Sequence, residues 1–224
     1  LLNSVASTGA LSEKQRNHLL AKMSAEVKSL VLKNNYHQNQ AISMASIKSP
    51  SHLGLYSRYL DEQEQLGFLD RTLEFLPDAK TIQGRKTEGL GLTRPELSVM
   101  FSYSKNILKA AILQTGLSED PYFAAFVSRA FPSLISERYS EQLKSHHLFH
   151  EIVATQVANH VVADMGIAFV YQMQDETGAP VAAIVRAWAA AKEIFNVADI
   201  HSSIEALDYH VDTDIQYQMI LDGI

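Results

Sequence analysis

Apolar residues recur at helical spacing through most of this chain, and this periodicity constrains the fold more than any other feature. The most regular pattern follows residues 178–180, where apolar side chains fall at i, i+3, i+4 and i+7. Its members are Val181, Ile184, Val185, Trp188, Ala191 and Phe195. Strand-like alternation is almost absent. The sequence therefore predicts an all-α multi-helix bundle of about seven or eight helices.

Two residue pairs mark helix starts in the middle of the chain. Thr93 is a candidate N-cap and Glu96 follows three residues later, the spacing of a capping box that satisfies two otherwise unpaired backbone N–H groups. Ser49 followed by Pro50 is also typical of a start, because proline is favoured in the first turn of a helix. We expect helices to begin at both places, the second running toward residue 67.

Similar signals divide the C-terminal half. Asp120, with a proline after it, predicts a helix that ends before Pro132. A long helical stretch is expected over residues 133–166, broken near His146 and ended by Gly166. Its predicted apolar face comprises Ala154, Val157, Ala158, Val161 and Met165.

Two shorter helices are expected nearer the ends of the chain. Ser24 is a candidate N-cap for residues 25–33, and Asp199 is a candidate N-cap for a helix through Leu207. In the first of these helices, three apolar side chains are expected to face inward: Val27, Leu30 and Val31.

The least regular region is residues 77–92, where a proline and three glycines interrupt any helical period. A loop or linker is expected there. It divides the chain into an N-terminal helical part, residues 1–76, and a C-terminal helical bundle, residues 93–224. The two parts can form separate helical subdomains.

The composition argues against several classes of function. The formal net charge is −6, and Lys and Arg are not clustered, whereas nucleic acid requires concentrated positive charge. The lack of cysteine excludes disulfides and thiolate sites and fits a reducing cytoplasm. No apolar run reaches the ~20 residues that span a bilayer, so no membrane partner is expected. A start at Leu1 rather than Met indicates an excised fragment.

His146 and His150 are the first candidates for a metal site, because they are spaced i, i+4 on a predicted helix and Glu151 adjoins them. The metalloprotease motif His-Glu-x-x-His is missing, since the next histidine is His160. A partly exposed polar cluster is therefore favoured, with metal binding as the minor alternative. We assign no metal ligand.

Gly89 and Gly91 precede a helix start, where glycines can let backbone N–H groups approach a phosphate. A dinucleotide fingerprint also needs a preceding strand, a third glycine and a later acidic residue, and these are missing. The P-loop motif and the Gly-x-Ser-x-Gly elbow are missing as well. We therefore assign no cofactor-binding and no catalytic residue.

Two other features have a structural explanation. The carboxylates of Asp61, Glu62 and Glu64 point in different directions on a predicted helix, which indicates a solvated face rather than an acid/base pair. Trp188 belongs to an apolar stripe and is expected in the core rather than in a ligand site.

Five longer strings occur in order along the chain. They are EVKSLVLKNNYHQNQAIS (26–43), LDRTLEFLP (69–77), GLTRPELSVMFSYSK (91–105), EIVATQVANHVVADMGIAFV (151–170) and DETGAP (175–180). They resemble the C-terminal helical region of the bacterial large-subunit NAD-specific glutamate dehydrogenases. The opening LLNSVASTGALSEKQRN is similar to the segment just downstream of the dehydrogenase core, so that the resemblance covers roughly residues 1–217.

The resemblance implies a cytoplasmic, homo-oligomeric oxidoreductase that converts L-glutamate, NAD and water to 2-oxoglutarate, ammonium and NADH. Such chemistry needs a Rossmann domain and a lysine-rich substrate cleft, which in this family lie upstream of the region resembled. NAD is thus expected for the parent enzyme. This fragment is expected to bind no cofactor and to be inactive alone.

Arg94 is the one residue of the Thr-Arg-Pro-Glu helix start that capping does not explain. A surface ion pair is the favoured explanation, because exposed pairs are common. The functional alternative is docking onto the dehydrogenase domain of the same chain. We expect the fragment to be a structural, assembly or regulatory scaffold. The alternative is a freestanding helical interaction or ligand-sensing module.

Overall fold

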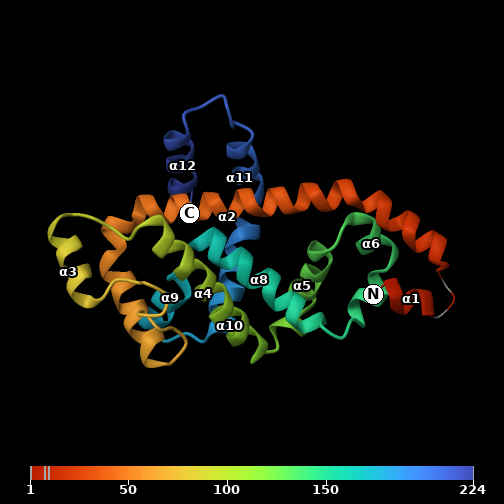
Figure 1. Ribbon diagram of the computed structural model, residues 1–224, viewed down its shortest axis with the longest axis horizontal. Helices are drawn as coiled ribbons and strands as arrows, with labels where there is room; N and C mark the ends of the chain where they lie inside the picture. Colours follow the sequence, from red (N-terminus) through yellow and green to blue (C-terminus); the bar gives the residue numbers. More distant parts are fainter. Residues whose placement is uncertain (1, 8, 10, 224) are drawn as a thin grey trace.

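Helices dominate the computed structural model, which describes residues 2–7, 9 and 11–223 and contains no strand within them (Figure 1). The predicted all-α class is confirmed. Among the described residues, eight of the twelve α-helices have nine or more residues. The α-helices are α1 (Leu2–Ser7), α2 (Glu13–Gln65), α3 (Ala79–Thr87), α4 (Arg94–Leu113), α5 (Pro121–Ala124), α6 (Ser133–Arg138), α7 (Ser140–Lys144), α8 (Phe149–Met165), α9 (Phe169–Thr177), α10 (Val181–Ile194), α11 (Val197–Glu205) and α12 (Thr213–Asp222). Two short 3-10 helices, η1 (Leu117–Glu119) and η2 (Ala125–Ala130), flank α5.

Helix α2 is a single helix of 53 residues that crosses the length of the molecule (Figure 1). It begins after Ser12, whose hydroxyl accepts a hydrogen bond from the backbone N–H of Gln15 in a capping box. The predicted start at Ser24 is therefore wrong. Ser24 lies inside α2, and its hydroxyl donates to the carbonyl of Leu20, a bond that serine makes when the preceding turn is also helical.

The predicted helix start at Ser49 and Pro50 is also wrong, because both residues lie inside α2. A proline within a helix lacks the N–H that would bond to the carbonyl four residues earlier, and its ring crowds that turn. Such a residue commonly bends a helix. Figure 1 shows α2 changing direction in its orange part, so that its last turns run down one side of the molecule.

The middle of α2 is uncovered by the described residues. Every residue from 27 to 36 is exposed. Val27 is 42% exposed, Leu30 39% and Val31 61%, so the prediction that these three side chains face the core is wrong here. The physical reason is that α2 rests on the other helices on either side of this stretch, where Met23 and Ala41 are buried.

Two other predicted boundaries are confirmed. Helix α4 begins after Thr93, whose backbone N–H donates to the Glu96 carboxylate at 2.7 Å in a capping box. Helix α5 begins after Asp120, whose carboxylate accepts from the N–H of Tyr122. The sequence analysis assigned no helix end to Gly178, which ends α9 in the left-handed conformation that glycine adopts without steric cost.

The stretch expected over residues 133–166 forms three helices. One break lies at Tyr139 and the other at residues 145–148, the place predicted near His146. Helix α8 ends at Gly166, as predicted, with a φ of 96°. Of its predicted apolar face, all members except the half-buried Met165 are buried.

The interval 77–92 is not a continuous loop, because it contains α3. The carboxylate of Asp78 accepts from the N–H of Thr81 and caps the helix, which then passes through Gly84. The division of the chain into subdomains at this interval stays a prediction.

The prediction that Asp199 is an N-cap is wrong. Helix α11 begins after Asn196, and Asp199 accepts from the Asn196 amide at 2.8 Å.

Helix α8 lies at the centre of the core, with α4 packed along it. The core also includes buried side chains from α1, α2, α3 and α10. A separate small apolar cluster of Met44, Ile204 and Ile220 attaches α11 and α12 to α2. Figure 1 shows these two helices above α2, with α4 and α8 below it.

In the described part of the chain, no single helix is long and apolar enough to cross a membrane. Only the pair α8 and α9, which is bent by 82°, meets the test of length and composition when the two helices are taken together.

Candidate functional site

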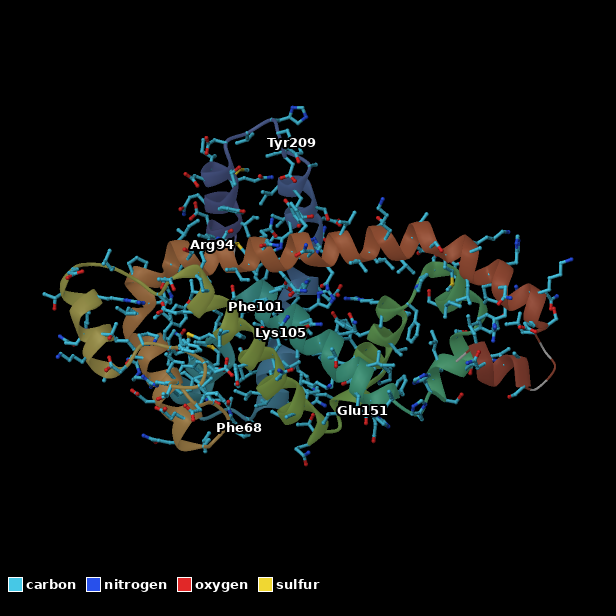
Figure 2. All side chains as sticks on the ribbon, viewed as in Figure 1. Phe68, Arg94, Phe101, Lys105, Glu151 and Tyr209 are labelled. Atoms are coloured by element: carbon cyan, nitrogen blue, oxygen red, sulfur yellow. The ribbon has the colours of Figure 1, made fainter. Side chains whose placement is uncertain are left out.

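Arg94, the candidate docking residue, lies in the first turn of α4 and is exposed beside α2 (Figure 2). Its guanidinium Nη1 donates to the hydroxyl of Ser43 at 2.9 Å. The partner is thus a hydroxyl on α2 rather than the carboxylate of a surface ion pair. The contact of Arg94 is one of several that join α2 to the helices that follow it. We call these contacts the α2 seam, and on α2 they involve Tyr36, His37, Ser43 and Ser49.

The next contact of the α2 seam lies at the proline inside α2. The backbone N–H of Leu92 donates to the Ser49 hydroxyl at 2.6 Å, and both residues are buried. Gly91 is so close that an added Cβ would lie 2.5 Å from the Ser49 Oγ and 2.8 Å from the backbone nitrogen of Pro50. This glycine is required by the close approach of two backbones.

Arg85 and Glu96 join α3 to α4 next to this point. The guanidinium donates to both carboxylate oxygens of Glu96, at 2.6 and 2.9 Å. Burial acts to raise the pKa of Glu96, but hydrogen bonds from Arg85 and Thr93 outweigh it and lower the pKa below its usual value. Glu96 therefore serves both as the capping residue of α4 and as the anchor of α3.

The other end of the α2 seam joins α2 to α11 and the turn after it. The Tyr36 hydroxyl donates to the Asp208 carboxylate at 3.1 Å. The Nε2 atom of His37 lies 3.2 Å from the Glu205 carboxylate. Burial, together with the bond to Asp208, raises the pKa of Tyr36. Gln216 of α12 donates to Asp208 as well, at 2.8 Å, so that α12 is held in the same network.

Four titratable side chains lie together where α8, α10 and α11 meet. Lys192 donates to Asp164 in an ion pair whose side chains are 18% and 16% exposed. Burial lowers the pKa of His160 to about 4, with Asp164 opposing and Lys192 supporting the shift. Burial also lowers the pKa of His201. Both histidines are therefore neutral at pH 7.

A hollow of about 180 Å³ adjoins this cluster. Trp188 lies on its wall, 5% exposed, so the prediction that this tryptophan belongs to the core is confirmed. The Lys192 Nζ lies 5.3 Å from the centre of the Trp188 ring. The buried Nε2 of His201, which also lines the hollow, has no hydrogen-bond partner among the described residues.

The three clustered histidines of the sequence do not converge. His146 lies in the turn before α8, stacked on His147 at 4.6 Å, whereas His150 is helical and its Nδ1 lies 2.8 Å from the Ser118 hydroxyl. The i, i+4 spacing therefore does not place His146 and His150 on one helix. Within the described ranges no group of three or more His, Asp or Glu side chains is arranged to hold a metal ion.

The carboxylates near residue 62 are more ordered than a solvated face. The side chains of Asp61 and Glu64 are 53% and 46% exposed, yet both pair with Arg71, whose side chain is only 8% exposed. Arg71 also donates to the carbonyl of Pro77. The sequence analysis missed Arg71, and the one available signal is that its two carboxylate partners are three residues apart on one helix.

Comparison with known families divides the chain into two matched segments. Residues 89–223 match the sequence model of the family described as glutamate dehydrogenase, C-terminal. Residues 1–45 match the model described as bacterial NAD-glutamate dehydrogenase, catalytic domain.

Individual relatives agree with these matches. The chain is similar to an NAD-specific glutamate dehydrogenase of Halomonas elongata, with 45% identity over 99% of this chain and 14% of the relative. It is 41% identical to the enzyme of the same name from Pseudomonas aeruginosa, over 98% of this chain and 14% of the relative. It is 32% identical to that of Mycobacterium tuberculosis, over 92% and 13%. The chain therefore spans about one seventh of the length of the curated relatives it matches.

The α2 seam joins the two matched segments. Ser43, Tyr36 and His37 lie within residues 1–45. Their partners Arg94, Asp208 and Glu205 lie within residues 89–223. The contact between Arg94 and Ser43 spans 51 positions in sequence, and the contact between Tyr36 and Asp208 spans 172. These polar contacts hold the segments that match two different family models against each other.

Proposed function

Because the chain belongs to the family of bacterial NAD-specific glutamate dehydrogenases, we propose that it is the C-terminal helical part of an enzyme that oxidises L-glutamate to 2-oxoglutarate and ammonium and reduces NAD. In this proposal the enzyme acts in the cytoplasm as a homo-oligomer. These residues supply no catalytic or cofactor-binding group. They are a scaffold that holds the catalytic domain in position and stabilises the assembly.

One observation carries the proposal. Helix α2 is continuous from Glu13 to Gln65, so it begins inside the segment matched by the catalytic-domain model and ends beyond it. The helices of residues 89–223 then pack on it through the α2 seam. A helix shared by two domains fixes the position of one domain relative to the other, because its internal hydrogen bonds resist bending.

The experiment compares the complete enzyme with a form that ends before residue 89. We expect the shortened enzyme to lose thermal stability and correct assembly, and glutamate oxidation to fall with them. Retained binding of NAD serves as the control that the dinucleotide domain is still folded. Unchanged assembly, stability and glutamate oxidation in the shortened form would overturn the scaffold role.

A second candidate is a helical module that senses a small ligand, and the hollow beside Trp188 favours it. The unpartnered Nε2 of His201 offers a hydrogen-bonding group next to an apolar wall. Calorimetry tests this candidate directly. Micromolar binding of NAD, glutamate or another amino acid by these 224 residues, abolished by His201→Ala, would favour the sensing role over the scaffold.

A further inference from the structure

Four apolar side chains of α2 are exposed, three of them on the stretch that bridges its two supports and the fourth, Leu20, just before that stretch. Leu20 is 45% exposed, Val27 42%, Leu30 39% and Val31 61%. Leu20, Val27 and Val31 are separated by seven and four residues, which places them along one side of an α-helix, with Leu30 next to them. We call these four residues the α2 stripe. A helix usually buries such a stripe against another element.

Positive charge surrounds the α2 stripe. Residues 13–33 contain five basic and two acidic residues, which gives a net charge of +3 (five minus two), whereas the whole chain has a net charge of −6. The basic residues are Lys14, Arg16, Lys22, Lys28 and Lys33. Both acidic residues already have partners. Glu13 lies 4.0 Å from Arg16, and Glu26 accepts hydrogen bonds from the backbone N–H and hydroxyl of Ser133. A complementary surface would be apolar with carboxylates at its rim.

The stretch that carries most of the α2 stripe is held at both ends. Glu26 binds Ser133 of α6 at 2.7 Å, and Tyr36 binds Asp208 at 3.1 Å. The side chains between them are thus presented on a helix that is already ordered. A partner that binds there loses little additional conformational entropy in the helix backbone.

The family matches indicate which partner covers the α2 stripe. All four residues lie within residues 1–45, the segment that matches the catalytic-domain model. A domain buries its apolar faces in its own core, and none of the described helices covers this one. The chain spans only 14% of its relatives, so most of such a protein lies outside these residues.

We propose that the α2 stripe is the surface on which the catalytic dehydrogenase domain of the same protein packs, through an apolar patch with an acidic rim. The inference rests on the proposed function. It places the surface on which the catalytic domain docks on one side of α2, next to the α2 seam that holds the C-terminal helices.

Zero-length carbodiimide cross-linking of the complete enzyme identifies the partner, because it joins lysine only to a carboxylate in direct contact. Lys28 and Lys33 are expected to join Asp or Glu residues of the catalytic domain. A mixture of isotopically light and heavy subunits shows whether the two peptides come from one chain. Cross-links to residues 89–223 of a second copy, or free lysines throughout, would overturn the proposal.

Two adjacent substitutions provide the matched comparison. Val31 and Leu32 are 61% and 59% exposed, but consecutive helical residues point about 100° apart. Val31→Asp and Leu32→Asp add the same charge to the same helical turn. We expect Val31→Asp to accelerate thermal inactivation of the complete enzyme about tenfold and Leu32→Asp to leave it nearly unchanged.

Equal behaviour of the two variants would refute the α2 stripe as a docking surface. The outcome is separable from the test of the scaffold role. If truncation before residue 89 impairs the enzyme while the two variants behave alike, the proposed function stands and this inference fails. If truncation has no effect, the proposed function fails on its own.

Discussion

The backbone of Gly91 lies directly against the side chain of Ser49, the residue before the proline inside α2. A Cβ at position 91 would lie 2.5 Å from the Ser49 hydroxyl oxygen and 2.7 Å from its Cβ. The adjacent N–H of Leu92 donates to that hydroxyl at 2.6 Å. The start of α4 is thus held against the part of α2 that carries Pro50.

Replacing Gly91 with alanine should destabilise the chain by about 1 to 3 kcal/mol, because the backbones at this contact would have to separate. Urea unfolding measures the change. The matched control is Gly84→Ala in α3, where an added Cβ meets nothing within 4 Å. That variant should be neutral or more stable by up to about 1 kcal/mol, since alanine is the better helix former. Equal effects of the two substitutions would contradict the tight contact at Gly91.

The bidentate contact between Arg85 and Glu96 should be worth more than an exposed pair. The two side chains are 21% and 12% exposed. We expect a double-mutant cycle with Arg85→Ala and Glu96→Ala to give a coupling free energy of about 1 to 3 kcal/mol. The pair Lys144 and Glu141, with side chains 65% and 77% exposed, provides a control cycle with about 0.5 kcal/mol or less. Similar coupling in both cycles would show that burial adds nothing.

His160 should make the stability of the chain fall in mild acid. Its pKa is lowered from 6.5 to about 4 in the folded chain. At pH 7 both states are neutral, but below pH 6.5 the unfolded chain binds a proton that the folded chain does not. Stability is therefore lost progressively from about pH 6.5 to 4, by up to about 3 kcal/mol from this residue.

Urea unfolding between pH 7 and pH 4.5 checks this dependence. His160→Gln should have a shallower fall in free energy of unfolding than the unmodified chain. A slope remains in that variant, because burial also lowers the pKa of His201. An exposed histidine at position 18 supplies the control, and His18→Gln should leave the slope unchanged. A wild-type slope in His160→Gln would contradict the prediction.

Arg94→Ala should reduce stability only slightly, by about 1 kcal/mol or less, because the residue is exposed and loses a single hydrogen bond to Ser43. Chemical denaturation of Arg94→Ala, Ser43→Ala and the double variant measures the coupling. If Arg94 acts through Ser43, its substitution should have little further effect once Ser43 is alanine. An undiminished loss in the Ser43→Ala background would point to another partner for Arg94.

Local signals predicted the features that depend on a few neighbouring residues. The capping box of Thr93 and Glu96 and the cap at Asp120 form between groups at most three residues apart, and Gly166 ends α8 four residues after the carbonyl that its N–H binds. Such contacts are nearly independent of the rest of the fold, so the residue types alone suffice. The same holds for the all-α class, which follows from apolar periodicity along the chain.

Signals of the same kind failed in α2. Ser24 and the Ser49-Pro50 pair are typical helix starts, yet α2 continues through both positions. A proline inside a helix costs about 3 kcal/mol, which contacts from other parts of the chain can offset. Here Leu92 and Gly91, more than 40 residues away in sequence, pack on Ser49 at that point. No window of neighbouring residues contains this information.

By itself, the sequence determined that the chain is helical, and it located the helix boundaries at Thr93, Asp120 and Gly166. Only the tertiary structure decided that α2 is one helix, that Ser43 and Arg94 meet, and that Val27, Leu30 and Val31 are exposed. Periodicity shows that a helix has an apolar side, because this depends on spacing alone. What covers that side depends on which distant elements reach it, and this is a property of the assembled fold.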